Sequence, residues 1–364
     1  PQCDVPISFI DTSLELLKNY NWGRDQGMAN FGGLESKRLI EKEAIGVVGC
    51  ITPWNVPLQI NLAKIIPALS AGCSVVLKPA PDTPWSATLI GAAANQTDIP
   101  DGIINIVPSS DPQSIGEQLV NDPRVDMISF TGSTATGRTI MSVAARTVKK
   151  VFLELGGKSA NIILDDADFS QALLSALAVC FHAGQGCAIQ TRLLIPRNRQ
   201  QEVGEILINY FKMIDYGGKN TDAHIMGPLV NSSQRSRVLD YIEKGKAEGA
   251  RILLGGNAPS HLEKGFYVEP TVFVDVTNDM TIAQEEIFGP VLCVIAYKDE
   301  QEAVQIANDS IFGLSGGVWS ADEARAIRVA RRLRAGTVNV NGGNFYSADA
   351  PFGGYKQSGI GREM

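Results

Sequence analysis

Short apolar runs rich in β-forming residues alternate with helical patterns along almost the whole chain of 364 residues. In the first half such runs begin at Ala44, Cys73, Ile103, Asp126 and Val151. Continuous apolar strands separated by helices are typical of a parallel sheet that helices cover on both faces. The sequence therefore predicts an α/β fold.

The second half repeats this alternation. The expected strands lie at 161–164, 192–196, 251–256, 291–297, 314–319 and 336–341, and the expected helices lie near 199–213, 231–247, 300–308 and 322–334. Because one domain usually takes about 100–200 residues, we expect two doubly wound parallel-sheet domains in series.

Net charge and the distribution of cysteines argue against several classes of partner and against a metal site. A net charge of −7 disfavours nucleic-acid and anionic-membrane partners, and no apolar stretch approaches the ~20 residues that cross a bilayer. The six cysteines are scattered, and neither they nor the three histidines have metal-ligand spacing, so no metal site is expected. Scattered cysteines in a chain of this size suit a reducing, cytoplasmic environment.

Two residues could carry acyl chemistry. Glu154 ends an apolar run and precedes Gly156 and Gly157, where a ligand or another backbone could approach closely. Cys187 lies in a glycine-rich run, unlike a cysteine packed in an apolar segment. A thiolate attacks carbonyl carbon, and a carboxylate can accept the proton of a thiol or of water. Taken singly, Cys187 could instead be an ordinary buried cysteine, and Glu154 could be an ordinary solvated glutamate.

A nucleotide site is suggested by the turn TGSTATG, which joins the run at Asp126 to a helical pattern. Free N–H groups at a helix N-terminus suit a pyrophosphate, although Ser and Thr are also ordinary N-caps. The dinucleotide fingerprint GxGxxG is absent, and the P-loop pattern fails because Phe152 replaces its leading glycine.

Asn55 and Lys78 add two polar groups near expected strand ends. The Asn55 amide, in the stiff segment ITPWNVP, could donate to an oxyanion, or it is a turn asparagine. Lys78 would place a cation at the ligand edge of the sheet, or it is a surface lysine.

Seven motifs occur in order: ITPWN, LKPA, FTGST, LELGGKSAN, GQGC, QEEIFGPV and PFGGYKQSGIGRE. With them the chain, from about residue 38 onward, resembles the NAD(P)-dependent aldehyde dehydrogenase superfamily. The resemblance implies oxidation of an aldehyde substrate to a carboxylic acid. Cys187 would be the nucleophile, and Asn55 with the Cys187 N–H would hold the oxyanion. After hydride transfer to the cofactor, Glu154 would activate water to hydrolyse the thioester.

The resemblance also implies roles for residues around the cofactor and the substrate. The implied cofactor contacts are Lys78 at the adenine ribose, Ser133 at the pyrophosphate, Trp54 and Gly132 along the cleft, Glu286 at the nicotinamide ribose, Phe288 beside the ring, and Gln234. Phe181 and Phe352 would shape the substrate tunnel, and Asn344, Phe345 and Tyr346 would form a part-aromatic, part-polar mouth.

The domain organisation implied by the family is a cofactor-binding domain (1–25 and 45–156), a small oligomerisation ribbon (26–44), a catalytic domain (157–355) and the start of a C-terminal segment (356–364). By the same resemblance, we expect this sequence to lack N- and C-terminal segments that family members carry. The implied assembly is a homodimer or homotetramer.

The cofactor preference departs from the family pattern at Pro81, where many NAD-preferring relatives carry a glutamate. Without that carboxylate, nothing at this position repels the 2′-phosphate of NADP, so the sequence is compatible with NADP. No obvious arginine is present to bind that phosphate, so NAD is favoured.

Three alternatives remain. They are a CoA-acylating relative, which retention of Glu154 disfavours; a cysteine hydrolase, for which His182 is the only nearby histidine base; and a non-catalytic relative. Cofactor reduction over a panel of aldehydes, with and without CoA, separates them.

Overall fold

The computed structural model describes residues 6–217, 225–343 and 346–363, and it divides into two compact units. The first unit holds the chain as far as Leu153, together with Ala348–Pro351 and Glu363. The second holds Glu154–Ser347 and Phe352–Arg362. The division after Leu153 lies close to the domain boundary that we expect after residue 156.

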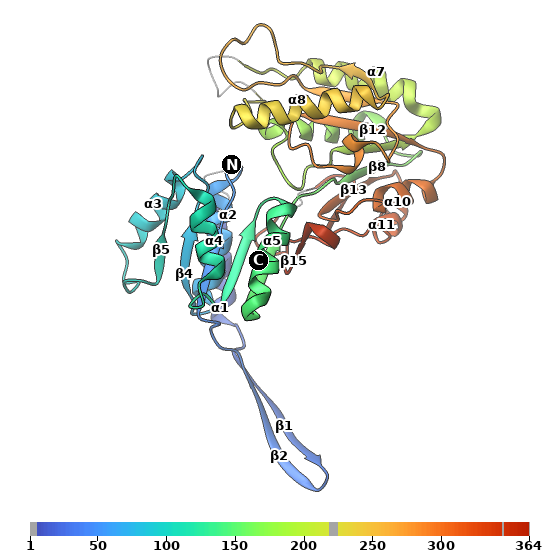
Figure 1. The fold of residues 1–364 in the computed structure, drawn as a ribbon. Coiled ribbons are helices and arrows are strands. Elements are labelled where there is room, and N and C mark those ends of the chain that lie inside the picture. Colours follow the sequence, from blue (N-terminus) through green and yellow to red (C-terminus); the bar gives the residue numbers. More distant parts are fainter. Residues whose placement is uncertain (1–5, 218–224, 344–345, 364) are drawn as a thin grey trace. The chain divides into compact units, whose positions relative to one another are not determined.

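The first unit is built around a sheet in which β7, β6, β3, β4 and β5 are neighbours in that order (Figure 1). Strand β3 is parallel to β4 and to β6, and β4 is parallel to β5. Ile65 of α2 packs with Val48 and Cys50 of β3. In contrast, Leu119 of α4 lies against the intervening Gly49, so the two helices cover opposite faces of the sheet. The elements are α1 (Ile7–Lys18), β3 (Val47–Ile51), α2 (Pro57–Ser70), β4 (Ser74–Lys78), α3 (Trp85–Ala94), β5 (Ile104–Ile106), α4 (Pro112–Asn121), β6 (Met127–Thr131), α5 (Thr134–Ala144) and β7 (Lys150–Glu154).

Helix α4 was not among the expected elements, because few of its residues are apolar. Its start signal is nevertheless present in the sequence: Asp111 accepts a hydrogen bond from the Ser114 N–H at 3.1 Å, and Pro112 follows the cap. Helix α1 and strand β11 were also not expected.

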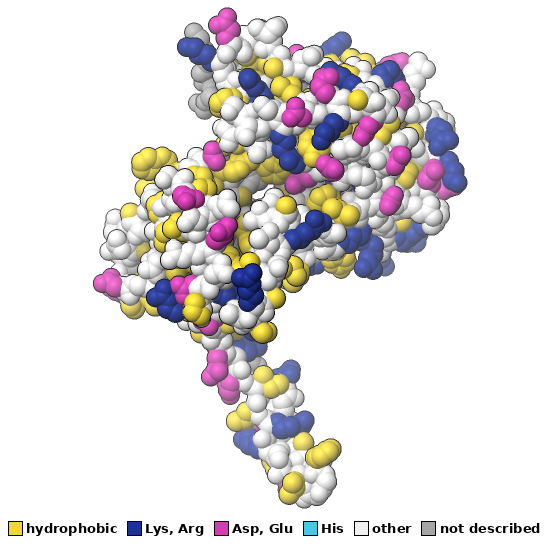
Figure 2. All heavy atoms as spheres, viewed as in Figure 1, with side chains coloured by type: hydrophobic (Ala, Val, Ile, Leu, Met, Phe, Trp, Pro, Cys, Tyr) yellow, Lys and Arg dark blue, Asp and Glu magenta, His cyan; other side chains and the backbone are white. Residues whose placement is uncertain are grey.

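A two-stranded antiparallel ribbon leaves the first unit, formed by β1 (Gly23–Phe31) and β2 (Leu34–Glu41). It begins slightly before the ribbon expected at 26–44. The large apolar side chains of Met28, Phe31 and Leu34 are 60%, 89% and 75% exposed, and Figure 2 shows apolar and basic side chains side by side on it.

The second unit contains a seven-stranded sheet in the order β10-β11-β12-β9-β8-β13-β14. Its elements are β8 (Ala160–Ile163), α6 (Phe169–Ala172), β9 (Arg192–Pro196), α7 (Gln200–Lys212), α8 (Ser232–Ala247), β10 (Arg251–Leu254), β11 (Thr271–Val274), α9 (Thr281–Gln284), β12 (Val291–Tyr297), α10 (Glu300–Asn308), β13 (Ser315–Trp319), α11 (Glu323–Ala330), β14 (Thr337–Val340) and β15 (Gly359–Ile360). The α/β fold expected from the sequence is confirmed.

The second sheet is mixed at one edge, where the sequence pattern predicted parallel strands. Strand β10 is antiparallel to β11, whereas β11, β12, β9, β8, β13 and β14 pair in parallel. The described residues 255–270, which join β10 to β11, contain no helix, so the connection lacks the crossover that a parallel pair needs.

Candidate active site

A strained loop precedes Cys187. This nucleophile loop, residues 182–187, contains three consecutive left-handed residues, His182, Ala183 and Gly184, with φ of 55°, 52° and 73°. For residues with a Cβ this conformation costs about 1–2 kcal/mol each. At Gly184 an added Cβ would overlap the Gly289 carbonyl, so that position requires glycine. Strain held in place by the surrounding structure is typical of functional sites.

Cys187 differs from the other described cysteines in its exposure. It is partly exposed, whereas Cys50, Cys73, Cys180 and Cys293 are buried. Its carbonyl lies so close to Gly157 that a Cβ there would overlap it. The nucleophile loop therefore packs directly on the glycine pair that follows Glu154.

Glu154 is the last residue of β7 and is 1% exposed. Burial raises the pKa of the Cys187 thiol well above its usual value, and the charges of Glu154 and Glu286 and a hydrogen bond that the thiol donates to the Glu154 carboxylate add to the effect. The thiol is consequently protonated at neutral pH, and its attack on a carbonyl needs a base. The nearby Glu154 carboxylate is suited to that role.

A second carboxylate, Glu286, follows α9 and contacts the same glycine pair. Its Oε1 accepts a hydrogen bond from the Gly157 N–H at 2.9 Å, and a Cβ on Gly156 would overlap the carboxylate. Burial raises the pKa of Glu286 to about 7, against the lowering effects of this hydrogen bond and of Arg237 and Lys158. Glu286 therefore changes charge near neutral pH.

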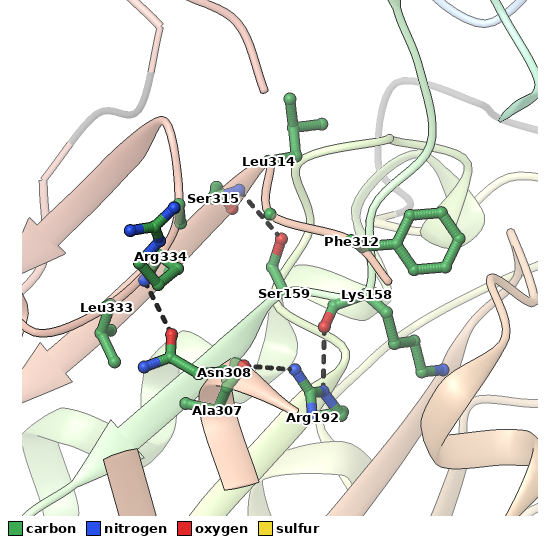
Figure 3. A pocket seen from close by; sticks show the side chains of 14 residues that line it. Lys158, Ser159, Arg192, Ala307, Asn308, Phe312, Leu314, Ser315, Leu333 and Arg334 are labelled. Atoms are coloured by element: carbon green, nitrogen blue, oxygen red, sulfur yellow. Dashed lines mark hydrogen bonds between the residues drawn. The ribbon is translucent and has the colours of Figure 1, made fainter. Parts of the chain in front are cut away.

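The segment after the glycine pair is anchored by two strands of the second sheet (Figure 3). Arg192 Nε donates to the Lys158 carbonyl at 2.9 Å, and the Ser315 N–H donates to Ser159 Oγ at 3.3 Å. Arg192 also donates to the last carbonyls of α10, at Ile306 and Ala307. These bonds hold the chain from Gly156 onward in a fixed register.

In the first unit, Lys78 ends β4 and is 5% exposed, and burial lowers its pKa. It lines a cavity of about 440 Å³, which we call the Lys78 cavity. The other lining residues are mostly apolar: Val47, Val76, Asn105, Val107, Ile115, Gln118, Leu119, Asp122, Arg124 and Val125. Its volume lies within the range of small-molecule sites.

Ser133 is the N-cap of α5, and its Oγ accepts a hydrogen bond from the Thr136 N–H at 3.2 Å. At the preceding Gly132 a Cβ would lie 2.5 Å from the Phe130 ring. Buried Asn55 and half-buried Trp54 follow β3 in the same unit. The role predicted for Asn55 at the Cys187 oxyanion stays a prediction.

The remaining predicted residues lie in the second unit. The Gln234 N–H donates to Oδ1 of Asn231, the N-cap of α8, at 3.0 Å. Phe288 has a left-handed backbone with φ of 63°. Phe352 is buried against Tyr346, with ring centroids 4.9 Å apart, whereas Phe181 is 56% exposed. Asn344 and Phe345 lie outside the described residues.

Two features were missed by sequence reasoning. Buried Gln185 bridges the nucleophile loop to Val230, and its position between two glycines before the cysteine was the available signal. In the first unit, buried Lys64 donates to Glu363 at 2.6 Å and to Ser129 at 3.1 Å. A lysine inside the otherwise apolar run LAKII was the signal there.

Within residues 6–217, 225–343 and 346–363, no group of three His, Cys, Asp or Glu side chains could hold a metal ion. In the same described part of the chain, no helix is long and apolar enough to cross a membrane.

The sequence and the fold are similar to those of known proteins. The family model described as "Aldehyde dehydrogenase family" matches residues 7–364. DhaS of Bacillus subtilis (strain 168) is 48% identical over 324 residues, or 88% of this chain. A 3-succinoylsemialdehyde-pyridine dehydrogenase of Pseudomonas sp. is 44% identical over the whole chain. The crystal structure of a Mycobacterium tuberculosis aldehyde dehydrogenase complexed with NAD+ covers 100% of this chain with a TM-score of 0.94 and 42% identity.

The chain is shorter than these proteins. It spans 65% of the length of DhaS and 74% of each of the other two.

Proposed function

We propose that this chain, which belongs to the aldehyde dehydrogenase family, oxidises an aldehyde to a carboxylic acid with NAD as hydride acceptor. The observation that carries the proposal is Cys187, a partly exposed residue on a strained loop, whose thiol lies beside the buried Glu154 carboxylate. A protonated nucleophile with an adjacent base is the arrangement that covalent catalysis needs.

In the proposed reaction Glu154 accepts a proton twice, first from the Cys187 thiol and later from water. Cys187 Sγ adds to the aldehyde carbon as the thiol proton passes to Glu154, and the Asn55 amide donates to the developing oxyanion. Once a hydride has left the substrate carbon, the acyl group remains on Cys187 as a thioester. Glu154 first gives up the thiol proton to solvent and then takes a proton from water, whose oxygen attacks the thioester. The Cys187 thiolate leaves and regains a proton from Glu154, which releases the acid and restores the thiol.

The residues present fit a dinucleotide. The Lys78 cavity has room for a nucleoside, the N-terminus of α5 after Gly132 and Ser133 suits a pyrophosphate, and Glu286 offers a carboxylate to ribose hydroxyls. When bound, NAD+ accepts the hydride. Trp54, Gln234 and Phe288 complete the proposed contacts. With Pro81 in place of a carboxylate, NADP is a second acceptor to be tested.

The substrate is an apolar aldehyde, aliphatic or aromatic. The edge-to-face pair Tyr346 and Phe352 supports this class, as does the aromatic substrate in the name of the pyridine dehydrogenase relative. Phe181 would lie at the entrance of the tunnel.

The assembly is a homodimer or homotetramer in the cytoplasm. The exposed apolar side chains of the β1–β2 ribbon support pairing with a second copy, because an isolated two-stranded ribbon is marginally stable. The buried free cysteines support a reducing compartment.

The test measures NADH and NADPH formation by the full chain over aliphatic, aromatic and cationic aldehydes. Cys187→Ala should abolish cofactor reduction, whereas Cys73→Ala, a buried cysteine in the first unit, should retain it. Glu154→Gln should keep a burst of one NADH per site, because without the Glu154 charge the Cys187 thiol ionises more readily. It should then turn over slowly, because thioester hydrolysis lacks its base. Rapid steady turnover by Glu154→Gln, or an absolute requirement for CoA, contradicts the proposed roles.

A further inference from the structure

We propose that Gln185 is a positioning residue. Its hydrogen bonds connect the nucleophile loop to the N-terminal end of α8 and thereby fix the position of Cys187 Sγ. The inference rests on the proposed function only in naming Cys187 as the nucleophile.

The side-chain amide of Gln185 donates one hydrogen bond and accepts another. Its Nε2 donates to the His182 carbonyl at 3.0 Å, and its Oε1 accepts from the Val230 N–H at 2.9 Å. The side chain is 3% exposed. A carbonyl only accepts and an N–H only donates, so the two partners fix the orientation of the amide and require both of its ends.

The bond to His182 closes the strained turn. The Gln185 N–H also donates to the His182 carbonyl, at 3.1 Å, so backbone and side chain of one residue converge on one acceptor. His182 and Ala183 both have left-handed backbones without being glycine. Such a conformation persists only when the surroundings over-determine it, and the Gln185 side chain supplies one of those constraints.

The bond to Val230 reaches α8, which also supports the second carboxylate. Val230 precedes Asn231, the N-cap of α8, and Arg237 on that helix donates from Nη2 to the Glu286 carbonyl at 2.7 Å. Helix α8 is therefore a common support for the nucleophile loop and for Glu286. Loss of the Gln185 bridge should free Cys187 from its place beside the two carboxylates while Glu286 keeps its own anchor.

The experiment follows alkylation of Cys187 by iodoacetamide against pH without cofactor or aldehyde, with the modified peptide identified by mass spectrometry. Gln185→Met removes both bonds, and Gln201→Met, on the exposed face of α7, is the control. We expect Gln185→Met to lower the apparent pKa of Cys187, with alkylation at pH 8 faster by about tenfold, because one pKa unit is a factor of ten in thiolate. The control should match wild type.

A second variant separates positioning from stability. In Gln185→Glu the protonated carboxyl can still donate to His182 and accept from Val230, but the carboxylate cannot donate. The ratio of its kcat to that of wild type should therefore rise towards one at low pH and fall by about 10²-fold at high pH, with the KM for NAD changed less.

An alkylation profile unchanged in Gln185→Met, together with a lowered melting temperature, would overturn the proposal and leave Gln185 a structural residue. If Gln185→Met does not fold, a pH-independent kcat ratio for Gln185→Glu overturns it equally. Because alkylation needs no turnover, a chain that reduces no cofactor would contradict the proposed function and still test Gln185.

Discussion

Glu286 accepts the Gly157 N–H at 2.9 Å, and Gly157 in turn leaves no room for a Cβ against the Cys187 carbonyl. The backbone of Gly157 thus lies against both the Glu286 carboxylate and the Cys187 main chain. The spacing of thiol and carboxylate depends on the absence of a side chain at this one position.

Replacement of that glycine should displace the nucleophile. In Gly157→Ala the methyl group would overlap backbone rather than a flexible side chain, so the loop must move. We expect kcat for aldehyde oxidation to fall by at least about tenfold, since small displacements of reacting groups are costly. Gly227→Ala is the matched control, because no atom lies within 4 Å of its Cβ position. Equal kcat values for the two variants would contradict the argument.

The charge of Glu154 should be visible in the reactivity of Cys187. Burial is the largest cause of the raised pKa of the Cys187 thiol, and the Glu154 charge is the second largest. Glu154→Gln should therefore lower that pKa. Alkylation of Cys187 by iodoacetamide at pH 8 should become faster by roughly tenfold per pKa unit. Glu263→Gln, at an exposed position, should leave the rate unchanged. Slower alkylation in Glu154→Gln would instead show that Glu154 activates the resting thiol.

Stability should fall with rising pH because of Glu286. Its pKa is about 7 in the folded protein and its ordinary value is 4.5, so between these values the folded state binds the proton that the unfolded state has lost. The stabilising contribution is complete below pH 4.5 and is lost as pH rises through 7, by up to about 3 kcal/mol. Urea unfolding of wild type and Glu286→Gln at pH 5 and pH 8 measures this slope. The variant should show a smaller decrease, and parallel curves would argue against a raised pKa.

The buried Lys64–Glu363 ion pair should be costly to break from one side. Lys64→Met leaves an unpaired carboxylate that is 5% exposed, and about 3–5 kcal/mol is typical for such a change. The double variant Lys64→Met/Glu363→Leu should recover much of the loss, because no buried charge remains. Urea-unfolding midpoints of the three proteins decide this, and a double variant no more stable than Lys64→Met would refute the account.

The positions of most strands and helices could be predicted because their apolar periodicity is local. The run RLLIP predicted β9 at Arg192–Pro196, and VLCVIAY predicted β12 at Val291–Tyr297. The antiparallel edge at β10 could not be read from its apolar residues, because strand direction depends on the connection and on the neighbouring strand. The resemblance to aldehyde dehydrogenases is confirmed by the family match.

The sequence by itself determined which groups are available: a cysteine in a glycine-rich loop, a glutamate at a strand end, and two glycines after it. Only the tertiary structure decided their chemical state. The Gly157 N–H and the Glu286 carboxylate are 129 positions apart in the chain, and they meet through packing. Burial then raises the pKa of both Cys187 and Glu286, because removing water disfavours their charged forms. Desolvation is a property of the folded surroundings, so no local pattern of residues could have specified it.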